Sequence, residues 1–406
     1  MHELSQTLDQ AILGLIIKSH ERAHNSKALE QAAFATTAYI QGCGKRMIAD
    51  GVSRRLIVLK NLLWDMQHAL PRGAELYEFF SNSCDVYEQR FDYATYISDY
   101  LLHAVPPADC FEQAVARRLK DMSFLVARLY QVEAARPTLL PQRMIACMLV
   151  LSMLNQPESY EAKDLLAAGR EAIPLSQDAL NLMQGITEGM NRDPRFFALN
   201  CSLLPTSADR SELLFLTVVQ LNEICFDLWI DALRQILSAV TVKRLTTETL
   251  NIAEHLCRLA KLAIACVSIL NDFTHDEFMQ FRHYTENAGA IQSRKYKELE
   301  LYTCAFVDDR IRQKGYEALP YLKNLSQYSE LRLYQLVKDL EPSAETIRLK
   351  ELLEQFEKLL LDWKRFHLHI ARSRLLNHGL PDKDRLDHYL SSSIKSTFKT
   401  NTAQPV

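Results

Sequence analysis

Two histidines near the end of the chain are the residues best suited to chemistry. His367 and His369 lie in a W-K-R-F-H-L-H motif within a stretch of helical periodicity. His367 shares one apolar stripe with Phe356, Leu360 and Trp363, whereas His369 points about 160° away at 3.6 residues per turn. The two imidazoles therefore cannot hold one metal ion. His367 is either a structural core residue or the axial ligand of an apolar cofactor such as haem.

Arg282 is a second candidate, because it follows an apolar face formed by Phe273, Phe278 and Phe281. A guanidinium binds a carboxylate through two parallel hydrogen bonds, so Arg282 could hold a substrate carboxylate or a haem propionate. A structural salt bridge to an acidic neighbour is the alternative.

Other candidate sites have weaker support. Glu21 and His24, with His20 one turn earlier, supply one of the two E-x-x-H motifs that a di-iron bundle needs, and a solvated helix face is the alternative. Asp308 and Asp309 resemble part of an acidic metal motif of terpenoid synthases, but a third acid is missing. The sequence contains neither a phosphate-binding glycine loop nor a G-x-S-x-G nucleophile motif.

Long helices are expected to position these residues. Only 11 Gly and 13 Pro occur in 406 residues, and this shortage predicts an all-α fold with short connections. Apolar periodicity predicts helices over residues 213–237, 246–270 and 343–376, and another that begins near His275. The first of these is apolar on nearly every side, which is typical of a helix in the centre of a bundle.

A cluster of turn-forming and small polar residues near position 200 divides the chain. We predict an N-terminal helical region over residues 1–205 and a helical bundle over residues 206–390. Residues 391–406, rich in Ser, Thr and Lys, are predicted to be a disordered tail. Asp209 and Glu212 have the spacing of a helix N-cap and its reciprocal glutamate, so they predict the start of the bundle's first helix.

The overall composition favours a cytoplasmic protein. With 47 basic and 50 acidic residues, the net charge of −3 gives no reason to expect nucleic acid or an anionic membrane as a partner. The nine cysteines form no C-x-x-C pair and fit reduced thiols. No signal peptide is recognisable, and the longest uncharged apolar stretch, 144–154, is too short to cross a bilayer. The sequence leaves open whether the protein forms a homo-oligomer.

Two segments of the chain resemble motifs of the tryptophan 2,3-dioxygenase and indoleamine 2,3-dioxygenase haem superfamily. The run E-L-L-F-L-T-V-V-Q-L-N-E, which begins at Glu212, resembles the pattern E-x-L-F-I-x-x-H-Q-x-x-E. Phe281 and Arg282, followed by Q-S-x-x-Y-x-x-x-E from Gln292, resemble the block F-R…Q-S-x-x-[YF]-R-x-x-E.

A third segment completes the resemblance. Trp363 and His367 match the superfamily's W-x-x-x-H segment, in which the histidine is the proximal haem ligand. The three segments occur in the superfamily's order and cover about residues 209–377. The resemblance implies an all-α bundle with a haem pocket in the C-terminal half.

The resemblance also implies a role for each matching residue. His367 would bind the iron of haem b from the proximal side, with Trp363 beside the cofactor. Arg282 would pair with the carboxylate of an amino-acid substrate. Phe215 and Phe278 would line the aromatic pocket.

The chain departs from the tryptophan dioxygenase pattern at two places. Val219 occupies the position of a distal histidine, a residue that indoleamine dioxygenases also lack. The glycine-rich loop that closes over substrate is replaced by a different sequence at 377–385. The chain therefore looks most like the divergent branch that contains monodechloroaminopyrrolnitrin synthase.

The expected function is that of a haem-dependent, dioxygenase-like oxygenase. It would use O2 and act on tryptophan or a related indole or aromatic amino acid. Two alternatives stay open. One is a haem-binding protein of the same fold with other oxidative chemistry or a sensor role. The other is a non-catalytic helical interaction module without a cofactor.

Overall fold

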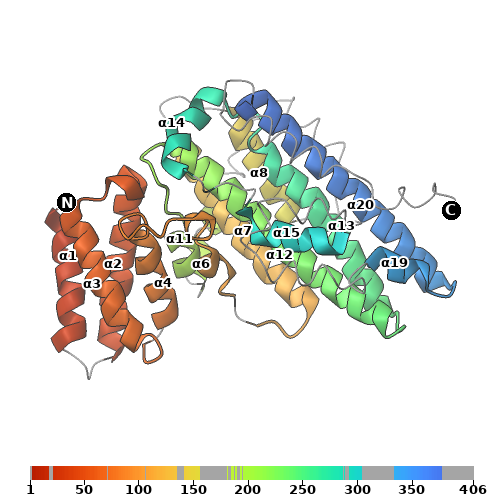
Figure 1. Cartoon of the computed structure of the whole chain (residues 1–406), viewed down its shortest axis with the longest axis horizontal. Coiled ribbons are helices and arrows are strands. Elements are labelled where there is room, and N and C mark those ends of the chain that lie inside the picture. Colours follow the sequence, from red (N-terminus) through yellow and green to blue (C-terminus); the bar gives the residue numbers. More distant parts are fainter. Residues whose placement is uncertain are drawn as a thin grey trace.

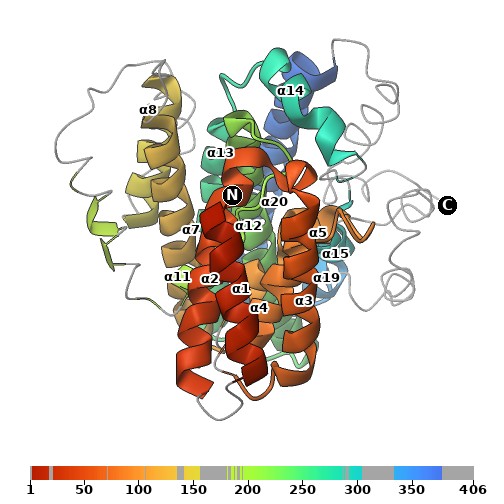
Figure 2. The same cartoon turned by 90° about the vertical axis from the view of Figure 1, so that its left-hand side faces the viewer.

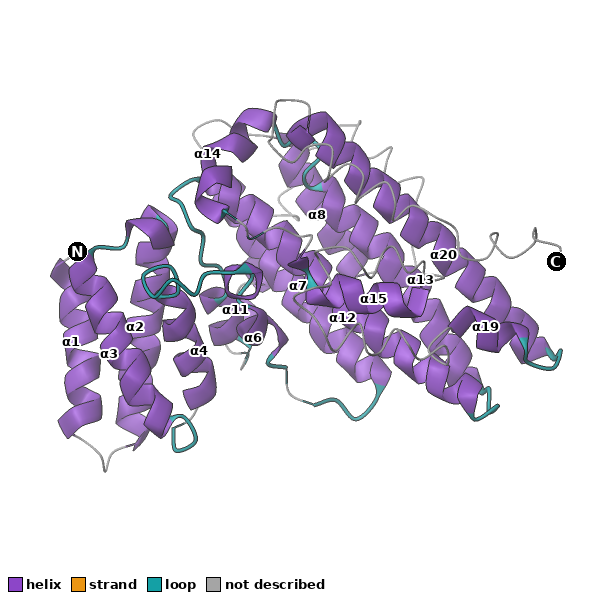
Figure 3. Cartoon of the chain, in the orientation of Figure 1, coloured by secondary structure: helices purple, strands orange, loops and turns teal. Residues whose placement is uncertain are grey.

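The computed structural model describes residues 2–17, 22–70, 72–105, 107–134, 141–155, 181, 184–186, 188–189, 193, 195–286, 288, 292–303 and 333–376. Every secondary-structure element within these ranges is a helix (Figure 3), which confirms the all-α prediction. The predicted tail, the loop at 377–385 and four weaker candidates lie outside the described residues: His20, Glu21, Asp308 and Asp309.

Two groups of helices make up most of the described chain (Figure 1). The first group consists of α1 (His2–Ile17), α2 (Arg22–Cys43), α3 (Asp50–Met66) and α4 (Gly73–Ser83). The second consists of α7 (Phe111–Ala134), α8 (Pro141–Asn155), α12 (Arg210–Thr241), α13 (Thr247–Ser268), α15 (Arg294–Thr303), α19 (Leu333–Lys338) and α20 (Ala344–Ile370). The side view shows the first group in front of α12 and α20 (Figure 2).

Short helices connect the two groups or lie at one end of the second. Those between the groups are η1 (Lys45–Met47), α5 (Tyr93–Tyr96), α6 (Asp99–His103) and α11 (Phe196–Cys201). At the end of the second group lie α14 (His275–Thr285) and the π-helix η4 (Ala371–Leu376), which directly continues α20.

The first group encloses a core of its own. Leu29 of α2, Leu56 of α3 and Phe79 of α4 are fully buried in it. Phe197 and Cys201 of α11 join the same core, although they lie more than a hundred residues further along the chain. Helix α11 therefore links the first group to the segment that leads into α12.

The larger core surrounds α12. This helix packs against α7, α13, α14, α15 and α19, and Trp229 near its middle is completely buried. Helix α12 is long and apolar enough to cross a membrane, but 83% of an apolar stretch of 18 residues in it is buried inside the protein. Its apolar character on all sides is explained by this central position, as the sequence predicts. Helices α7 and α8, from the predicted N-terminal region, pack into this same core; the predicted domain boundaries stay a prediction.

The helices predicted over 246–270 and 343–376 are confirmed as α13 and as α20 with η4, and α14 begins at the expected His275. Polar residues fix where they start. Thr246 and Ser343 cap α13 and α20 by accepting hydrogen bonds from backbone N–H groups in the first turn.

The start of α12 differs in one detail from the prediction. Asp209 caps the helix by accepting from the backbone N–H of Ser211 at 2.6 Å. Glu212 does not return a bond to the N-cap, so that part of the prediction is wrong. Its carboxylate instead accepts four hydrogen bonds of 2.5 to 2.7 Å from the backbone N–H and hydroxyl groups of Thr206 and Ser207. Glu212 is fully buried, and a buried carboxylate is costly unless it is hydrogen-bonded. The four donors of the preceding loop satisfy both of its oxygens.

A single glycine permits the first group to dock on this loop. Gly44 has a φ of +81°, and a Cβ placed there would lie 2.4 Å from the Cα of Ser207. The residues that follow it pair with the loop, because the N–H of Lys45 donates to the carbonyl of Pro205 at 2.9 Å and that of Arg46 to Thr206. Only glycine combines this backbone conformation with such a close approach.

Candidate functional site

The three segments that resemble the haem superfamily pack against one another in the bundle. The indole N–H of Trp363, on α20, donates to the side-chain oxygen of Asn222, on α12, at 3.0 Å. The Trp363 ring lies 5.4 Å from the ring of Phe226 and 5.8 Å from that of Tyr296, on α15. One residue of the third segment therefore contacts the first and the second.

A buried hydrogen-bond network joins the first and second segments again. Glu223 of α12 is 1% exposed and accepts a hydrogen bond from the hydroxyl of Tyr93 at 2.7 Å. Ser293 also hydrogen-bonds to this carboxyl group. Burial raises the pKa of Glu223 to about 7, against the opposing effect of these hydrogen bonds.

His367 lies one turn after Trp363 on α20. Its ring stacks on the indole, with centroids 5.3 Å apart and an angle of 16° between the planes. His367 is partly buried and His369 is exposed, as the periodicity predicts. Removal from water lowers the pKa of His367 to about 4, so its imidazole is neutral at neutral pH.

The chemistry of His367 suits a single axial ligand. None of the described residues hydrogen-bonds to its ring, so a nitrogen lone pair is available to a metal. No group of three His, Cys, Asp or Glu side chains with metal-binding geometry occurs within the described ranges. A metal at His367 would therefore have to bring most of its own ligands, as haem iron does.

Phe215 and Phe278, predicted to line one pocket, do lie together. Phe215 is on α12 and Phe278 on α14, and their ring centroids are 5.9 Å apart. Phe281 lies 5.5 Å from both of them, and Phe273 lies 6.2 Å from Phe215. These four rings form an aromatic cluster between the start of α12 and α14.

Arg282 extends from the last turn of α14, next to this cluster. Its Nη1 donates to the hydroxyl of Thr285 at 2.8 Å and to the carbonyl of Glu286 at 2.5 Å. No acidic side chain among the described residues forms an ion pair with Arg282, so the salt bridge considered from the sequence is not formed there. Burial lowers the pKa of this guanidinium, which is nonetheless charged at any physiological pH.

Val219 lies on the side of α12 that faces the N-terminal region. It packs against a small buried cluster of Tyr93, Tyr96, Ile97, Leu216 and Ala288. Neither tyrosine was expected at the site, because both lie in the predicted N-terminal region and carry no motif. Val219 thus has apolar and phenolic neighbours.

The helix directions bring the predicted residues to one end of the bundle. The ring centroids of Trp229 and Phe356 are 5.8 Å apart, and those of Phe226 and Trp363 are 5.4 Å apart. The earlier residue of α12 thus contacts the later residue of α20, so the two helices run antiparallel. His367 follows Trp363 by one turn, and Val219 precedes Phe226 by two. Helix α14 packs against η4, which continues α20, at this same end (Figure 1).

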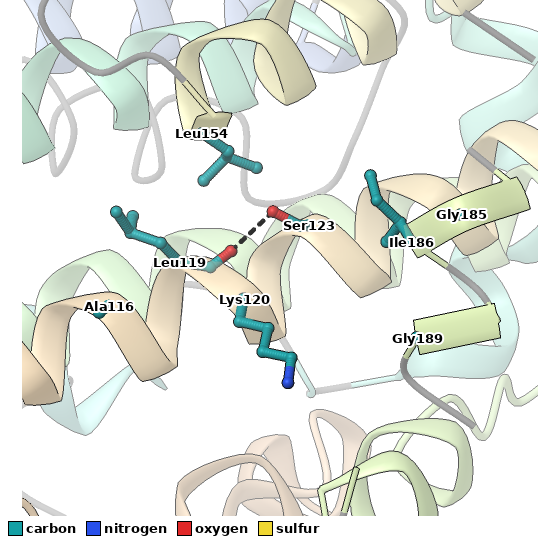
Figure 4. A pocket seen from close by; sticks show the side chains of 8 residues that line it. All are labelled: Ala116, Leu119, Lys120, Ser123, Leu154, Gly185, Ile186 and Gly189. Carbon is teal, nitrogen blue, oxygen red and sulfur yellow. Dashed lines mark hydrogen bonds between the residues drawn. The ribbon is translucent and has the colours of Figure 1, made fainter. Parts of the chain in front are cut away.

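A separate cavity of about 460 Å³ lies between α7, the end of α8 and the residues Gly185, Ile186 and Gly189 (Figure 4). Small and apolar side chains form most of its wall, including Ala116, Leu119 and Leu154. Lys120, the one charged residue among the described residues of its wall, forms a salt bridge with Asp193. None of the predicted site residues lines this cavity, so it has no part in the candidate site.

Comparisons with models of protein families, with curated proteins and with solved structures found no match for this chain.

Proposed function

We propose that this protein is a haem-dependent oxygenase that acts on tryptophan or a related indole or aromatic amino acid. The observation that supports it is the meeting of the three motif segments around Trp363, with the neutral imidazole of His367 stacked on that indole. No described residue hydrogen-bonds to the ring of His367, which leaves a ring nitrogen available to a metal.

The described residues fit the chemistry of haem b. His367 would hold the iron from the proximal side, because its ring is uncharged at neutral pH and has a free lone pair. Trp363 would fix the plane of that imidazole by stacking, while its own N–H is held by Asn222. When bound, haem supplies the iron that activates O2.

The other site residues would bind and orient the substrate. Arg282 has donors that no described carboxylate occupies, so it would pair with the carboxylate of an amino acid. Phe215 and Phe278 would hold the aromatic ring. Val219 would exclude water and give the reacting oxygen few hydrogen-bond donors. The proposal places this chemistry in the cytoplasm, with O2 and an aromatic amino acid as partners.

A visible spectrum after expression with excess haem tests the cofactor. We expect His367→Ala to abolish or strongly weaken the Soret band, while the matched control His369→Ala leaves it nearly unchanged. Equal effects of the two substitutions would refute the assignment. A colourless wild-type protein would favour the interaction module without a cofactor.

The substrate is tested separately. We expect L-tryptophan to shift the spectrum, and Arg282→Ala to weaken this shift more than it weakens haem retention. O2 consumption that depends on the substrate distinguishes an oxygenase from a haem sensor. A spectrum unaffected by every indole amino acid tried would refute the substrate class even if haem is bound.

A further inference from the structure

Arg46, in the short helix η1 of the N-terminal region, contacts the end of α14 that carries Arg282. Its Nε donates a hydrogen bond to the backbone carbonyl of Tyr284 at 2.5 Å. Its Nη2 forms an ion pair with the carboxylate of Glu286 at 2.8 Å. Both partners lie at least 238 positions further along the chain. Helix η1 therefore connects the first group of helices to the last turn of α14.

Arg282 is bonded to the same turn. Its Nη1 donates to the backbone carbonyl of Glu286 at 2.5 Å and to the hydroxyl of Thr285 at 2.8 Å. That hydroxyl donates in turn to the carbonyl of Arg282 at 2.9 Å. Two guanidinium groups thus converge on Glu286, because Arg46 binds its side chain and Arg282 binds its backbone. With Nη1 held in this way, a carboxylate that accepts two parallel hydrogen bonds would use the edge formed by Nε and Nη2.

The backbone of Glu286 explains why this turn needs support. Glu286 is the C-cap of α14, with a φ of +45° and a ψ of −115°. Residues other than glycine rarely adopt a positive φ, and they keep it only where surrounding contacts hold it. The side chain of Glu286 is 56% exposed, so packing around it is limited. Its bonds to Arg46 and Arg282 therefore help to maintain the strained conformation.

Arg46 is itself held in place by the loop before α12. Its backbone N–H donates to the carbonyl of Thr206 at 3.2 Å, beside the close approach that Gly44 permits. Its guanidinium lies over the ring of Phe91, 5.5 Å from the centroid, which is a favourable cation–π distance. The side chain is only 21% exposed. Arg46 thus has a defined position from which it can hold the end of α14.

We propose that Arg46 is a positioning residue for Arg282. It fixes Glu286, and through Glu286 it fixes the direction in which the Arg282 guanidinium meets a ligand. The proposal rests on the proposed function, in which Arg282 binds the carboxylate of the substrate. It gives the N-terminal region a role in substrate affinity through a residue that does not contact the substrate.

Calorimetric titration of the full-length protein, expressed with excess haem, tests this role with two probes. Indole-3-propionate carries the carboxylate without the ammonium group, and tryptamine carries the ammonium group without the carboxylate. We expect Arg46→Met to weaken binding of indole-3-propionate by about threefold to tenfold, as for one partly exposed ion pair and one hydrogen bond. Binding of tryptamine should change by less than about twofold.

The matched control is Arg55→Met. Arg55 is 34% exposed and pairs with Asp9 at 2.7 Å inside the first group of helices. Its removal therefore deletes an ion pair of similar exposure that has no contact with α14. This control should alter neither affinity.

A double-mutant cycle separates positioning from a general effect on the fold. In an Arg282→Ala background, Arg46→Met should weaken indole-3-propionate by less than about twofold further, because the residue that it positions is gone. Arg46→Lys retains a charge opposite Glu286 and should recover part of the affinity. Glu286→Gln removes the same ion pair from its exposed side and should weaken indole-3-propionate selectively. It decides the question if Arg46→Met does not fold.

Four results would overturn the positioning role: unchanged affinity of Arg46→Met for indole-3-propionate, equal weakening of both probes, an undiminished effect in the Arg282→Ala background, or no binding of indole-3-propionate to the wild type. A haem-free protein whose carboxylate affinity still depends on both Arg46 and Arg282 would retain the positioning role and refute the oxygenase. A coloured, active protein indifferent to Arg46→Met would refute the positioning role and retain the oxygenase.

Discussion

Glu223 should make the stability of this protein fall as the pH rises towards neutrality. Burial raises the pKa of this carboxyl group from its ordinary value of 4.5 to about 7 in the folded protein. Below pH 4.5 the group is protonated in both the folded and the unfolded chain. Between pH 4.5 and 7 the unfolded chain releases the proton while the folded protein retains it, so raising the pH favours unfolding.

The size of the effect follows from the two pKa values. Each pH unit between them changes the free energy of unfolding by about 1.4 kcal/mol, so the full window amounts to about 3 kcal/mol. Glu223→Gln removes this titration but retains an acceptor for the hydroxyl of Tyr93. Relative to wild type, the variant should gain about 3 kcal/mol of stability between pH 4.5 and pH 8.

Urea unfolding followed by circular dichroism at pH 4.5, 6, 7 and 8 measures this difference. The matched control is Glu254→Gln, which removes a carboxylate paired with Arg348 at the surface. The control should change stability by less than about 1 kcal/mol at each pH, because such exposed pairs contribute little. If the difference between Glu223→Gln and wild type stays constant across this range, Glu223 does not retain its proton in the folded protein.

Two further predictions concern stability. Arg143 is 1% exposed and binds Asp272 at 2.8 Å and Glu277 at 2.6 Å; Arg143→Met should cost about 3–5 kcal/mol in chemical unfolding, because it leaves both carboxylates without that cation. The exposed Arg348→Met should cost less than about 1 kcal/mol, and equal losses would contradict the argument. Gly44→Ala should lower stability by more than about 1 kcal/mol, because φ is positive and Ser207 is in the way. Gly42→Ala, with nothing within 4 Å, should instead raise the melting temperature slightly, and a similar loss in both variants would refute the steric explanation.

Helices α12, α13 and α20 could be predicted because the information that specifies them is local. Apolar periodicity and polar caps such as Thr246 and Ser343 lie within the segment that they define. The partner of Glu212 could not be predicted in this way. A capping box and a bond to the preceding loop use the same carboxylate, and only the folded position of Thr206 and Ser207 decides between them.

The same distinction between local information and long-range contacts applies to the residues of the candidate site. Motif spacing predicted His367 and Phe215, which lie on the long helices α20 and α12, and Arg282, which follows the aromatic residues of α14. Tyr93 and Tyr96 belong to a helix of four residues with no periodicity, and their role depends on which face of α12 that helix meets. Contacts across more than a hundred residues leave no spacing signal in a single sequence.

The central position of α12 has a consequence for synthesis of the chain. Its apolar surface is covered partly by helices made earlier, such as α7, and partly by residues of α20, which begins about a hundred residues after α12 ends. At roughly 5–20 residues per second, a ribosome needs at least about five seconds to make that interval. During this time part of the apolar surface of α12 stays uncovered. Chaperone binding during translation is therefore expected at α12 before α20 emerges.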